Sequence, residues 1–288
     1  MFDPFKNELY GRNDLFPSSH SPRNHKFNEF DKMERWVGKT AIVTGSSSGI
    51  GAAISEKFVK LGINVVGLAR RMNLLEKLSE KISQNTNLNA KFYPLQCDMS
   101  KEENILQAFS WIEDNVGPIS IMVNNAGVYM PTTIINGDSN SWRITTDLNV
   151  LAACICTKLA IKSMKSHNID DGQIINIGSI SGYYVPYVDP PVLNIYSSSK
   201  FCLRSVTETL RRELRYYKSK IRTTYIAPGL VATDLLAVDD SSDTDGMVSD
   251  EIPMLKSEDV ADVCAFVLST QPHCQLPEIV MRVVGEEI

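Results

Sequence analysis

Residues 40–51 read Thr40-Ala-Ile-Val-Thr44-Gly45-Ser-Ser-Ser-Gly49-Ile-Gly51, an apolar run followed directly by three closely spaced glycines. The apolar residues after this run recur at helical spacing up to a glycine that ends the pattern: Ile50, Ala53, Ile54, Phe58, Leu61 and Gly62. An apolar run, a glycine-rich turn and an amphipathic stretch in this order predict a buried strand that leads into a helix.

Each glycine of this turn has a separate physical use. Gly45 allows the tight turn, Gly49 lets the backbone approach a pyrophosphate, and Gly51 lets the helix pack closely, while the helix N-terminus offers free N–H groups. The alternative is an ordinary glycine-rich turn, and the G-x-x-x-G-x-G spacing has a longer first turn than the G-x-G-x-x-G fingerprint. The strand before the turn and the helix after it favour dinucleotide binding.

Apolar runs and amphipathic stretches alternate from this turn to the end of the chain. The predicted strands are residues 40–44, 63–68, 90–96, 119–123, 174–177, 221–226 and 279–283. The predicted helices are residues 50–61, 74–82, 102–116, 142–164, 196–217 and 257–268, the last capped by Ser257. Seven apolar strands separated by helices predict an α/β fold, a single doubly wound Rossmann-fold domain with a seven-stranded parallel sheet.

Two segments fall outside this alternation. Residues 1–32 are rich in Asn, Pro, Ser, Phe and charge without either period, so we expect a disordered tail before a domain at 33–288. Residues 235–254 are dense in Asp, Ser and Gly, and we expect a substrate loop at about 229–255.

The composition excludes several classes of protein. The chain has 288 residues, 43% of them hydrophobic, and a formal net charge of -5, so neither nucleic acid nor anionic lipid is attracted in general. The six cysteines lack any CxxC pair and the four histidines lack ligand spacing, so we expect no metal. No apolar run reaches the ~18 residues of a membrane helix, which predicts no integral membrane segment and a cytoplasmic protein.

The end of the second predicted strand reads Gly67-Leu-Ala-Arg70-Arg71. A carboxylate at this point would hold a ribose 2'-hydroxyl, whereas two guanidinium groups suit a 2'-phosphate. The alternative is a solvated arginine pair, although the start of a helix is an unfavourable place for cations. We therefore expect NADP rather than NAD, with Arg70 as the main reason and Arg71 or Ser46 assisting.

The fifth predicted helix opens with Tyr196-Ser-Ser-Ser-Lys200, whose spacing places the phenol and the ammonium on one face. A nearby cation stabilises phenolate and should lower the pKa of Tyr196 toward the working range. A tyrosine tuned in this way can exchange a proton with a hydroxyl or carbonyl oxygen. Taken alone, the Tyr-x-x-x-Lys spacing is a weak indication of an acid/base site. In a chain that also has a predicted nucleotide-binding turn, it is a stronger one.

Five motifs together carry a resemblance to a known family. They are Thr44-Gly-x-x-x-Gly-Ile-Gly51, Asn124-Asn-Ala-Gly127, Ser179, Tyr196-x-x-x-Lys200 and Pro228-Gly229. In this order they resemble the short-chain dehydrogenase/reductase family over residues 36–283. Within it, Met33-Glu-Arg-Trp36 and Cys97-Asp-Met-Ser100 are similar to the branch that holds insect NADP-dependent farnesol dehydrogenases and animal dehydrogenase/reductase family member 11.

The resemblance implies a role for each matching residue. Tyr196 would be the acid/base, Lys200 would lower its pKa and hold the nicotinamide ribose, Ser179 would bind the substrate oxygen, and Asn149 would hold a water of the proton relay. Asp98 would contact the adenine and Thr233 the nicotinamide amide. The implied NADP-binding residues are Gly45, Ser46, Ser48, Gly49, Ile50, Gly51, Arg70, Arg71, Asp98, Met99, Asn125, Ala126, Gly127, Tyr196, Lys200, Pro228, Gly229, Val231 and Thr233.

Structural alternatives exist for several of these residues: Ser179 as a strand-end cap, Asn149 as a polar kink in a helix, and Asn125 as a turn former. Ser179 also lies 17 positions before Tyr196, a longer gap than is usual in the family. Ser181 would share a face with Ser179 if the strand continued, so it competes for the same role.

We expect the substrate to be a small apolar alcohol or carbonyl compound, because three segments around the nicotinamide end are rich in apolar residues. The expected lining is Tyr183, Tyr184, Val185, Tyr187, Val188, Val192, Leu193, Leu230, Val231, Leu235, Leu236 and Met130, with Asp189 and Asp234 as the only charges. The branch resemblance favours a farnesol-like alcohol over a steroid. Rival interpretations are a non-catalytic NADP-binding regulatory protein and a sugar-nucleotide epimerase. The family resemblance also implies a homodimer or homotetramer.

Overall fold

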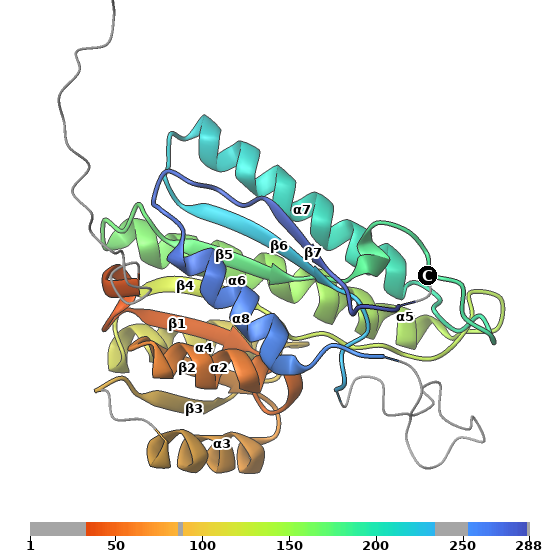
Figure 1. Cartoon of the computed structure of the whole chain (residues 1–288), viewed down its shortest axis with the longest axis horizontal. Coiled ribbons are helices and arrows are strands. Elements are labelled where there is room, and N and C mark those ends of the chain that lie inside the picture. The colour runs from red at the N-terminus through yellow and green to blue at the C-terminus, as the bar shows by residue number, and fades with distance from the viewer. Residues whose placement is uncertain (1–32, 86–88, 234–252, 287–288) are drawn as a thin grey trace, which may run out of the picture.

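The computed structural model describes residues 33–85, 89–233 and 253–286, which include every predicted strand and helix (Figure 1). The expected tail at 1–32 and residues 234–252 of the expected substrate loop lie outside the described residues. Met33 and Trp36 are both buried, and the indole Nε1 of Trp36 donates to the Leu268 carbonyl at 2.8 Å.

Seven parallel strands form one sheet in the order β3-β2-β1-β4-β5-β6-β7, which confirms the predicted fold class. They are β1 (Thr40–Thr44), β2 (Asn64–Ala69), β3 (Phe92–Gln96), β4 (Ile119–Asn124), β5 (Gln173–Ile177), β6 (Arg222–Pro228) and β7 (Glu278–Met281). The strand order reverses between β1 and β4, and such a switch point opens a crevice at the carboxyl ends of the strands.

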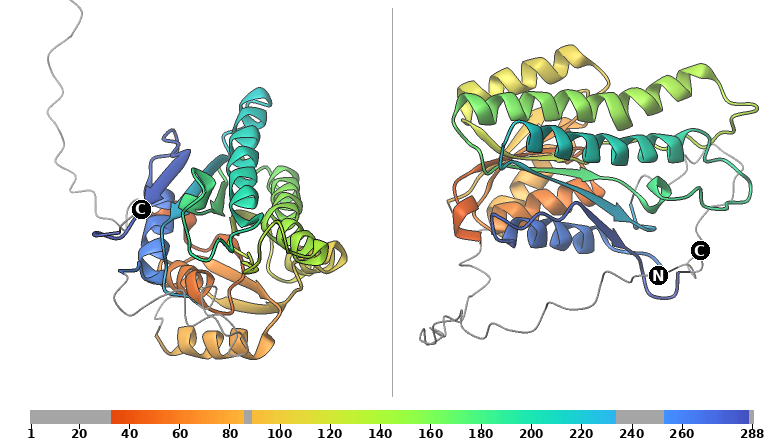
Figure 2. Two further views of the ribbon diagram at one scale, coloured as in Figure 1. Left: turned by 90° about the vertical axis from the view of Figure 1, so that its right-hand side faces the viewer. Right: turned by 90° about the horizontal axis from the view of Figure 1, so that it is seen from above.

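Helices cover both faces of the sheet (Figure 2). One layer contains α2 (Gly49–Lys60), α3 (Met72–Gln84) and α8 (Ser257–Ser269), and the other contains α4 (Glu102–Asn115), α6 (Ala152–Ser166) and α7 (Tyr196–Tyr216). In β1, Ala41 and Val43 belong to the core under the first layer, whereas Ile42 belongs to the core under the second. Because both faces are buried, the strands read as continuous apolar runs.

Two predicted helix features differ in the structure. The helix expected at 142–164 is divided into α5 (Ser139–Thr146), a π-helical turn (Asp147–Leu151) and α6. Ser257 is the first residue of α8 and not its cap; Lys256 takes the cap position, and its N–H donates to the Asp259 carboxylate at 2.7 Å. The carboxylate of Asp259 thus accepts from the N–H of the cap residue, which is one half of a capping box.

The segment Ser139–Ser166 is long and apolar enough to cross a membrane by length and composition alone. Ala152, Cys156, Ala160 and Met164 of this segment are buried in the core beside β4. A core helix passes the same test, so the segment is weak evidence for a membrane span.

Candidate active site

A cavity of about 1740 Å³ lies at the carboxyl ends of the strands, where the switch point predicts a ligand. This volume exceeds the ~300–1,000 Å³ of a typical small-ligand pocket, so the cavity has room for a dinucleotide and a second molecule. All seven strands contribute a residue that directly follows or closely follows the strand: Gly45, Arg70, Asp98, Asn125, Ser179, Gly229 and Arg282.

The glycine-rich turn has the geometry that an anion requires. Gly45 and Gly49 have positive φ angles of 72° and 55°, a conformation that favours glycine. A Cβ atom on Gly51 would lie 2.3 Å from the Gly45 carbonyl oxygen, so α2 can start this close to the turn only with glycine there. Ser48 precedes α2 without a side-chain cap bond, which leaves the N–H groups of the first turn for a ligand. The turn therefore fits a pyrophosphate.

Ser46 does not take the place that we expected. Its side chain is fully buried and donates to the Val43 carbonyl at 2.7 Å, and its N–H donates to the Leu68 carbonyl at 3.3 Å. Both polar groups of Ser46 are therefore used in hydrogen bonds to the backbone. The cavity side of the turn is formed by Ser47 and Ser48. The side-chain role assigned to Ser46 is corrected accordingly.

The two arginines after β2 border the same end of the cavity. The Arg71 guanidinium donates from Nη2 to the Ser48 hydroxyl at 2.7 Å and to the Ser47 hydroxyl at 3.0 Å. Arg70 lines the cavity beside it, with no carboxylate at this strand end. Two guanidinium groups and two hydroxyls in one corner form a donor set suited to a phosphate ester. Sequence reasoning missed Ser47, although it lies inside the motif.

Asp98, expected at the adenine, is fixed by its own turn. Its Oδ1 accepts hydrogen bonds from the N–H and the hydroxyl of Ser100 at 3.1 and 2.7 Å. Burial pushes the pKa of Asp98 upward, but these bonds, with smaller contributions from Arg70 and Lys101, hold it below its usual value. The carboxylate therefore stays ionised and is held in one orientation. Met99 lines the cavity beside it.

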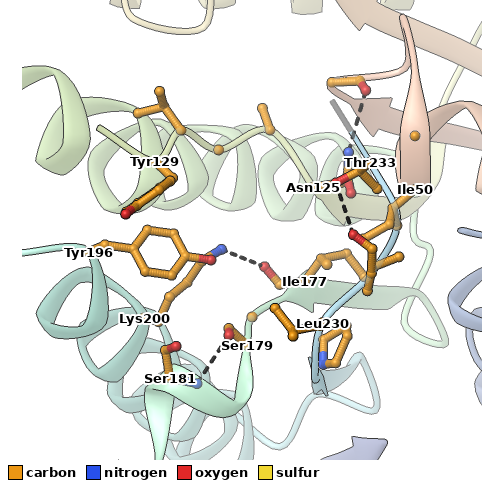
Figure 3. Close-up of a pocket in the computed structure, with 18 of the residues that line it drawn as sticks. Ile50, Asn125, Tyr129, Ile177, Ser179, Ser181, Tyr196, Lys200, Leu230 and Thr233 are labelled. Carbon is orange, nitrogen blue, oxygen red and sulfur yellow. Dashed lines mark hydrogen bonds between the residues drawn. The ribbon is translucent and has the colours of Figure 1, made fainter. Parts of the chain in front are cut away.

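Asn125 joins the strand end of β4 to the glycine-rich turn. Its Nδ2 donates to the Thr44 carbonyl at 2.9 Å, while the Thr44 hydroxyl accepts from the N–H groups of Asn125 and Ala126 at 3.0 and 2.9 Å. The side chain is thus used as a structural link (Figure 3), and the residues Asn125, Ala126 and Gly127 form one wall of the cavity.

The structure brings Ser179, Tyr196 and Lys200 together at the other end of the cavity (Figure 3). Tyr196 begins α7 and Lys200 follows one turn later, while Ser179 comes two residues after the end of β5. The Lys200 Nζ donates to the Ile177 carbonyl at 3.3 Å. Tyr129, which sequence reasoning missed, packs edge-on against Tyr196 at 5.5 Å between ring centroids.

The expected lowering of the Tyr196 pKa by Lys200 is not found in the protein alone. Burial raises the pKa of Tyr196 to about 12, and the hydrogen bond with Ser179 only partly opposes this rise. Burial also lowers the pKa of Lys200 to about 8. Because the ammonium lies 5.6 Å from the ring centroid and is directed to Ile177, it does not offset the burial of the phenol.

Ser179 and Ser181 have different positions, contrary to the shared strand face that we considered. β5 ends at Ile177, and Ile180–Gly182 form a 3-10 turn, so strand alternation does not extend to Ser181. The Ser181 N–H donates to the Ser179 hydroxyl at 3.0 Å, and Ser179 is the hydrogen-bond partner of Tyr196. Ser181 therefore orients the Ser179 side chain.

Asn149 lies on the π-helical turn and is buried. Its Oδ1 accepts from the Val128 N–H at 2.8 Å, and its Nδ2 donates to the Val128 carbonyl at 3.0 Å and to the Ser199 hydroxyl at 3.0 Å. The amide therefore holds the loop after β4 against α7. Its expected role in a proton relay stays a prediction.

The substrate end of the cavity matches the expected lining in part. The expected residues found there are Tyr184, Tyr187, Val188, Leu193, Leu230 and Val231. Tyr183 turns away, since its hydroxyl donates to the Glu278 carboxylate at 2.7 Å, and Val185, Val192 and Met130 do not line the cavity. Asp234, Leu235 and Leu236 lie outside the described residues.

Two further charged residues line this end, so the expected set of charges was incomplete. They are Arg282 and Glu286, which follow the last strand. The Gly229 N–H donates to the Met281 carbonyl at 2.8 Å, which brings the end of the chain over the residues after β6. The Arg282 guanidinium donates to the Tyr184 hydroxyl at 2.7 Å. No sequence signal links residues so far apart.

Thr233 reaches the nucleotide end from the loop after β6. A Cβ atom on Gly49 would lie 3.1 Å from its Cγ2, and the Thr233 hydroxyl donates to the Val231 carbonyl at 3.4 Å. Pro228, Gly229 and Val231 line the same wall, and Ile50 closes it from the start of α2.

Comparison with known proteins gives a consistent result. The family model described as short chain dehydrogenase matches residues 39–243. The chain is 42% identical to dehydrogenase/reductase SDR family member 11 of Gallus gallus, over 87% of this chain and 98% of the relative. It is 39% identical to the farnesol dehydrogenase of Aedes aegypti, over 88% of this chain and 100% of the relative.

Solved structures share the fold. The closed form of serine dehydrogenase complexed with NADP+ is similar with a TM-score of 0.73 and 26% identity, over 84% of this chain and 94% of that chain. A metagenomic short-chain oxidoreductase in complex with NADP is similar with a TM-score of 0.70 and 26% identity, over 86% of this chain and 98% of that chain.

Proposed function

The chain belongs to the short-chain dehydrogenase family, and from this premise we propose that it transfers a hydride between NADP(H) and the carbon of an alcohol or carbonyl group. Tyr196 is the proposed acid/base, Ser179 the group that binds the reacting oxygen, and Lys200 the cation that supports both the cofactor and Tyr196. The observation that carries the proposal is the meeting of these three side chains in the cavity that also contains the glycine-rich turn.

NADP(H) fits the residues present better than NAD(H). The cofactor supplies the hydride donor or acceptor when bound, and the chain supplies its position. The uncapped start of α2 suits the pyrophosphate, and the corner formed by Arg70, Arg71, Ser47 and Ser48 suits a 2'-phosphate. Solved relatives at 26% identity were complexed with NADP, which supports the same assignment.

The protonation states of Tyr196 and Lys200 bear on the proton transfer of the proposed reaction. With a pKa of about 12, Tyr196 is protonated at neutral pH and is ready to donate to a developing alkoxide in carbonyl reduction. Oxidation of an alcohol needs the phenolate, so it requires added positive charge near Tyr196. Lys200, buried with a pKa of about 8, is the protein's cation at this place.

The substrate that we propose is an apolar alcohol or its aldehyde or ketone, of isoprenoid size. Tyr184, Tyr187, Val188, Leu193 and Leu230 give the substrate end an apolar lining, and a relative at 39% identity is named farnesol dehydrogenase. Arg282 also lines this end; it is exposed and donates to the Tyr184 hydroxyl.

We further propose a cytoplasmic homo-oligomer with no nucleic-acid partner. All six cysteines are free thiols, which suits a reducing compartment. The net charge of -5 gives no general attraction for nucleic acid.

A chain-length series tests the proposed function. NADPH formation is followed with NADP and primary alcohols and prenols of increasing length, and NADPH consumption with the matching aldehydes and with steroid ketones. We expect kcat/KM to rise at least several-fold per isoprene unit up to farnesol, because each buried CH₂ contributes ~0.8 kcal/mol. A flat series, or a preference for short polar alcohols, rejects the apolar substrate. Tight NADPH binding without turnover of any carbonyl compound favours a regulatory protein.

A further inference from the structure

Tyr225 lies in the middle of β6 and is fully buried, although it does not line the cavity. Its side chain belongs to a small core cluster with Ala153, Leu203 and Ala227, between the sheet and helices α6 and α7. The neighbouring Ile226 belongs to the core on the opposite face of the sheet. Strand alternation therefore points the Tyr225 phenol at the helix that carries Tyr196 and Lys200.

The phenol hydroxyl contacts the backbone of two proposed catalytic residues at once. The Ser179 N–H donates to the Tyr225 oxygen at 3.2 Å, and the hydroxyl in turn faces the carbonyl oxygens of Ser179 and Lys200, each at 3.2 Å. One hydroxyl can accept from the amide and donate to one of the two carbonyls at a time. The contacts cross from β6 to the turn after β5 and to the first turns of α7.

Two glycines make the space that this phenol occupies. A Cβ atom on Gly178 would lie 2.0 Å from the Tyr225 Cζ, and one on Gly182 would lie 2.2 Å from the hydroxyl oxygen. Neither glycine has a positive φ angle, so backbone conformation does not explain their presence. The segment 178–182, which carries Ser179, is thus built around the Tyr225 hydroxyl.

The geometry points to Tyr225 as a positioning residue of the proposed reaction: its hydroxyl fixes the turn that carries Ser179 against the helix that carries Lys200. This inference rests on the proposed function, because it names a residue that fixes the positions of the proposed catalytic groups relative to each other. Ser179 and Lys200 come from different elements, and a displacement of about 1 Å in such a constellation can cost up to ~10²-fold in rate.

The phenol is held firmly enough for this task. Its ring is enclosed by Gly178, Gly182 and Leu203, and the Tyr183 ring lies 6.2 Å away between centroids. Burial raises the pKa of Tyr225, so the hydroxyl keeps its proton at every working pH. It therefore acts as a constant structural link and has no acid/base role of its own.

The test compares two tyrosine-to-phenylalanine variants that each lose one hydrogen-bonded hydroxyl. Tyr225→Phe keeps the ring and removes the contacts to Ser179 and Lys200, whereas the control Tyr183→Phe removes a hydroxyl bonded to Glu278. We expect Tyr225→Phe to lower kcat about 5- to 20-fold, with KM for the carbonyl substrate changed less than threefold. Tyr183→Phe should stay within twofold of the wild type in both constants.

A second readout does not depend on turnover or on bound cofactor. Because the Ser179 amide loses its acceptor, hydrogen exchange in a peptide that covers residues 178–183 should become at least fivefold faster in Tyr225→Phe than in Tyr183→Phe. If Tyr225→Phe does not fold, Gly182→Ala replaces it, since the new Cβ displaces the same hydroxyl while the phenol remains. The same changes in kcat and exchange are then expected.

The outcomes separate this inference from the proposed function. Wild-type protein that turns over no alcohol or carbonyl compound rejects the proposed function, and the exchange measurement then still decides whether Tyr225 holds the Ser179 turn. Wild-type turnover with equal kcat and equal exchange in Tyr225→Phe and Tyr183→Phe rejects the positioning role. A lower melting temperature with unchanged kcat also rejects it, because the hydroxyl would then only stabilise the fold.

Discussion

The nucleotide end and the substrate end of the cavity are built in different ways. At the nucleotide end, the turn and the arginines belong to one β1-α2-β2 unit, and Arg71 bonds Ser47 across only 24 positions of the sequence. At the substrate end, Arg282 bonds Tyr184 across 98 positions. The phosphate corner of the nucleotide end is assembled locally, whereas the substrate end is assembled by the whole fold.

This difference has a consequence for how each end tolerates change. The glycine turn depends on the positive φ angle of Gly45 and on the close backbone approach at Gly51, where a Cβ atom would not fit. The substrate end depends on side chains from loops and from the end of the chain, which can be exchanged without altering the sheet. We therefore expect large effects from the reacting groups, intermediate effects at the nucleotide end and small effects at the substrate rim.

The largest effect should come from Tyr196→Phe, which removes the proposed proton donor. We expect kcat to fall by at least ~10² while NADPH binding changes little, since the ring and its packing on Tyr129 remain. Steady-state kinetics together with NADPH fluorescence titration measure both quantities. A variant that keeps more than about a tenth of the wild-type kcat shows that another group is the acid/base.

The next effect concerns the locally built end. Charge-assisted hydrogen bonds contribute ~1.5–3 kcal/mol each, so Arg70→Ala should raise KM for NADP roughly 10- to 100-fold and leave KM for NAD unchanged. Arg71→Ala should act in the same direction, because it removes the second guanidinium group of the corner and its hydrogen bonds to Ser47 and Ser48. Arg215→Ala, at the far end of α7, is the matched control. Equal kcat/KM for NADP and NAD in the wild type contradicts the assignment.

The same contrast explains what could be predicted from sequence. The seven strands and the glycine turn follow from periodicity and from glycines at fixed positions, and the structure confirms the sheet. The phenol of Tyr225 between two glycines and the return of Arg282 to Tyr184 follow from tertiary packing. Such contacts have no local pattern, because the residues meet only after the strands are ordered in the sheet.

The lowered pKa of Lys200 could not be predicted from its position four residues after Tyr196. The i, i+4 relation to Tyr196 indicated mutual stabilisation of charge, whereas burial governs both groups in the protein alone. Burial depends on β5 and on the loop after β4, which lie outside the sequence of this helix.

This burial gives a stability prediction for the cofactor-free protein. The pKa of Lys200 is about 8 in the folded state against 10.5 ordinarily, so between these values the unfolded chain binds a proton that the folded chain has lost. The free energy of unfolding should therefore rise with pH in this window, by on the order of 2 kcal/mol from pH 8 to 10. Below pH 8 both states are protonated and the contribution is constant.

Urea unfolding of the wild type and of Lys200→Met from pH 7 to 10 checks this prediction. The difference between the two proteins isolates Lys200, because every other titrating group is shared. Tyr196 acts in the opposite direction only above pH 10, where the unfolded chain loses a phenol proton that the folded chain keeps. A wild-type-minus-variant difference that is flat from pH 8 to 10 shows that Lys200 titrates normally.

The smallest effect should come from the rim of the substrate end, where Tyr184 and Arg282 meet. Their hydrogen bond of 2.7 Å joins an exposed guanidinium to a half-buried ring, and solvent competes for such a contact, so we expect it to contribute about 0.5 kcal/mol. Tyr184→Phe should therefore raise KM for an isoprenoid substrate about two- to threefold, with kcat and KM for NADP unchanged. Tyr216→Phe, an exposed tyrosine near the far end of α7, is the control and should change nothing. If Tyr184→Phe instead lowers kcat tenfold or more, the rim takes part in the chemical step, and the division between a locally built nucleotide end and an adaptable substrate end is wrong.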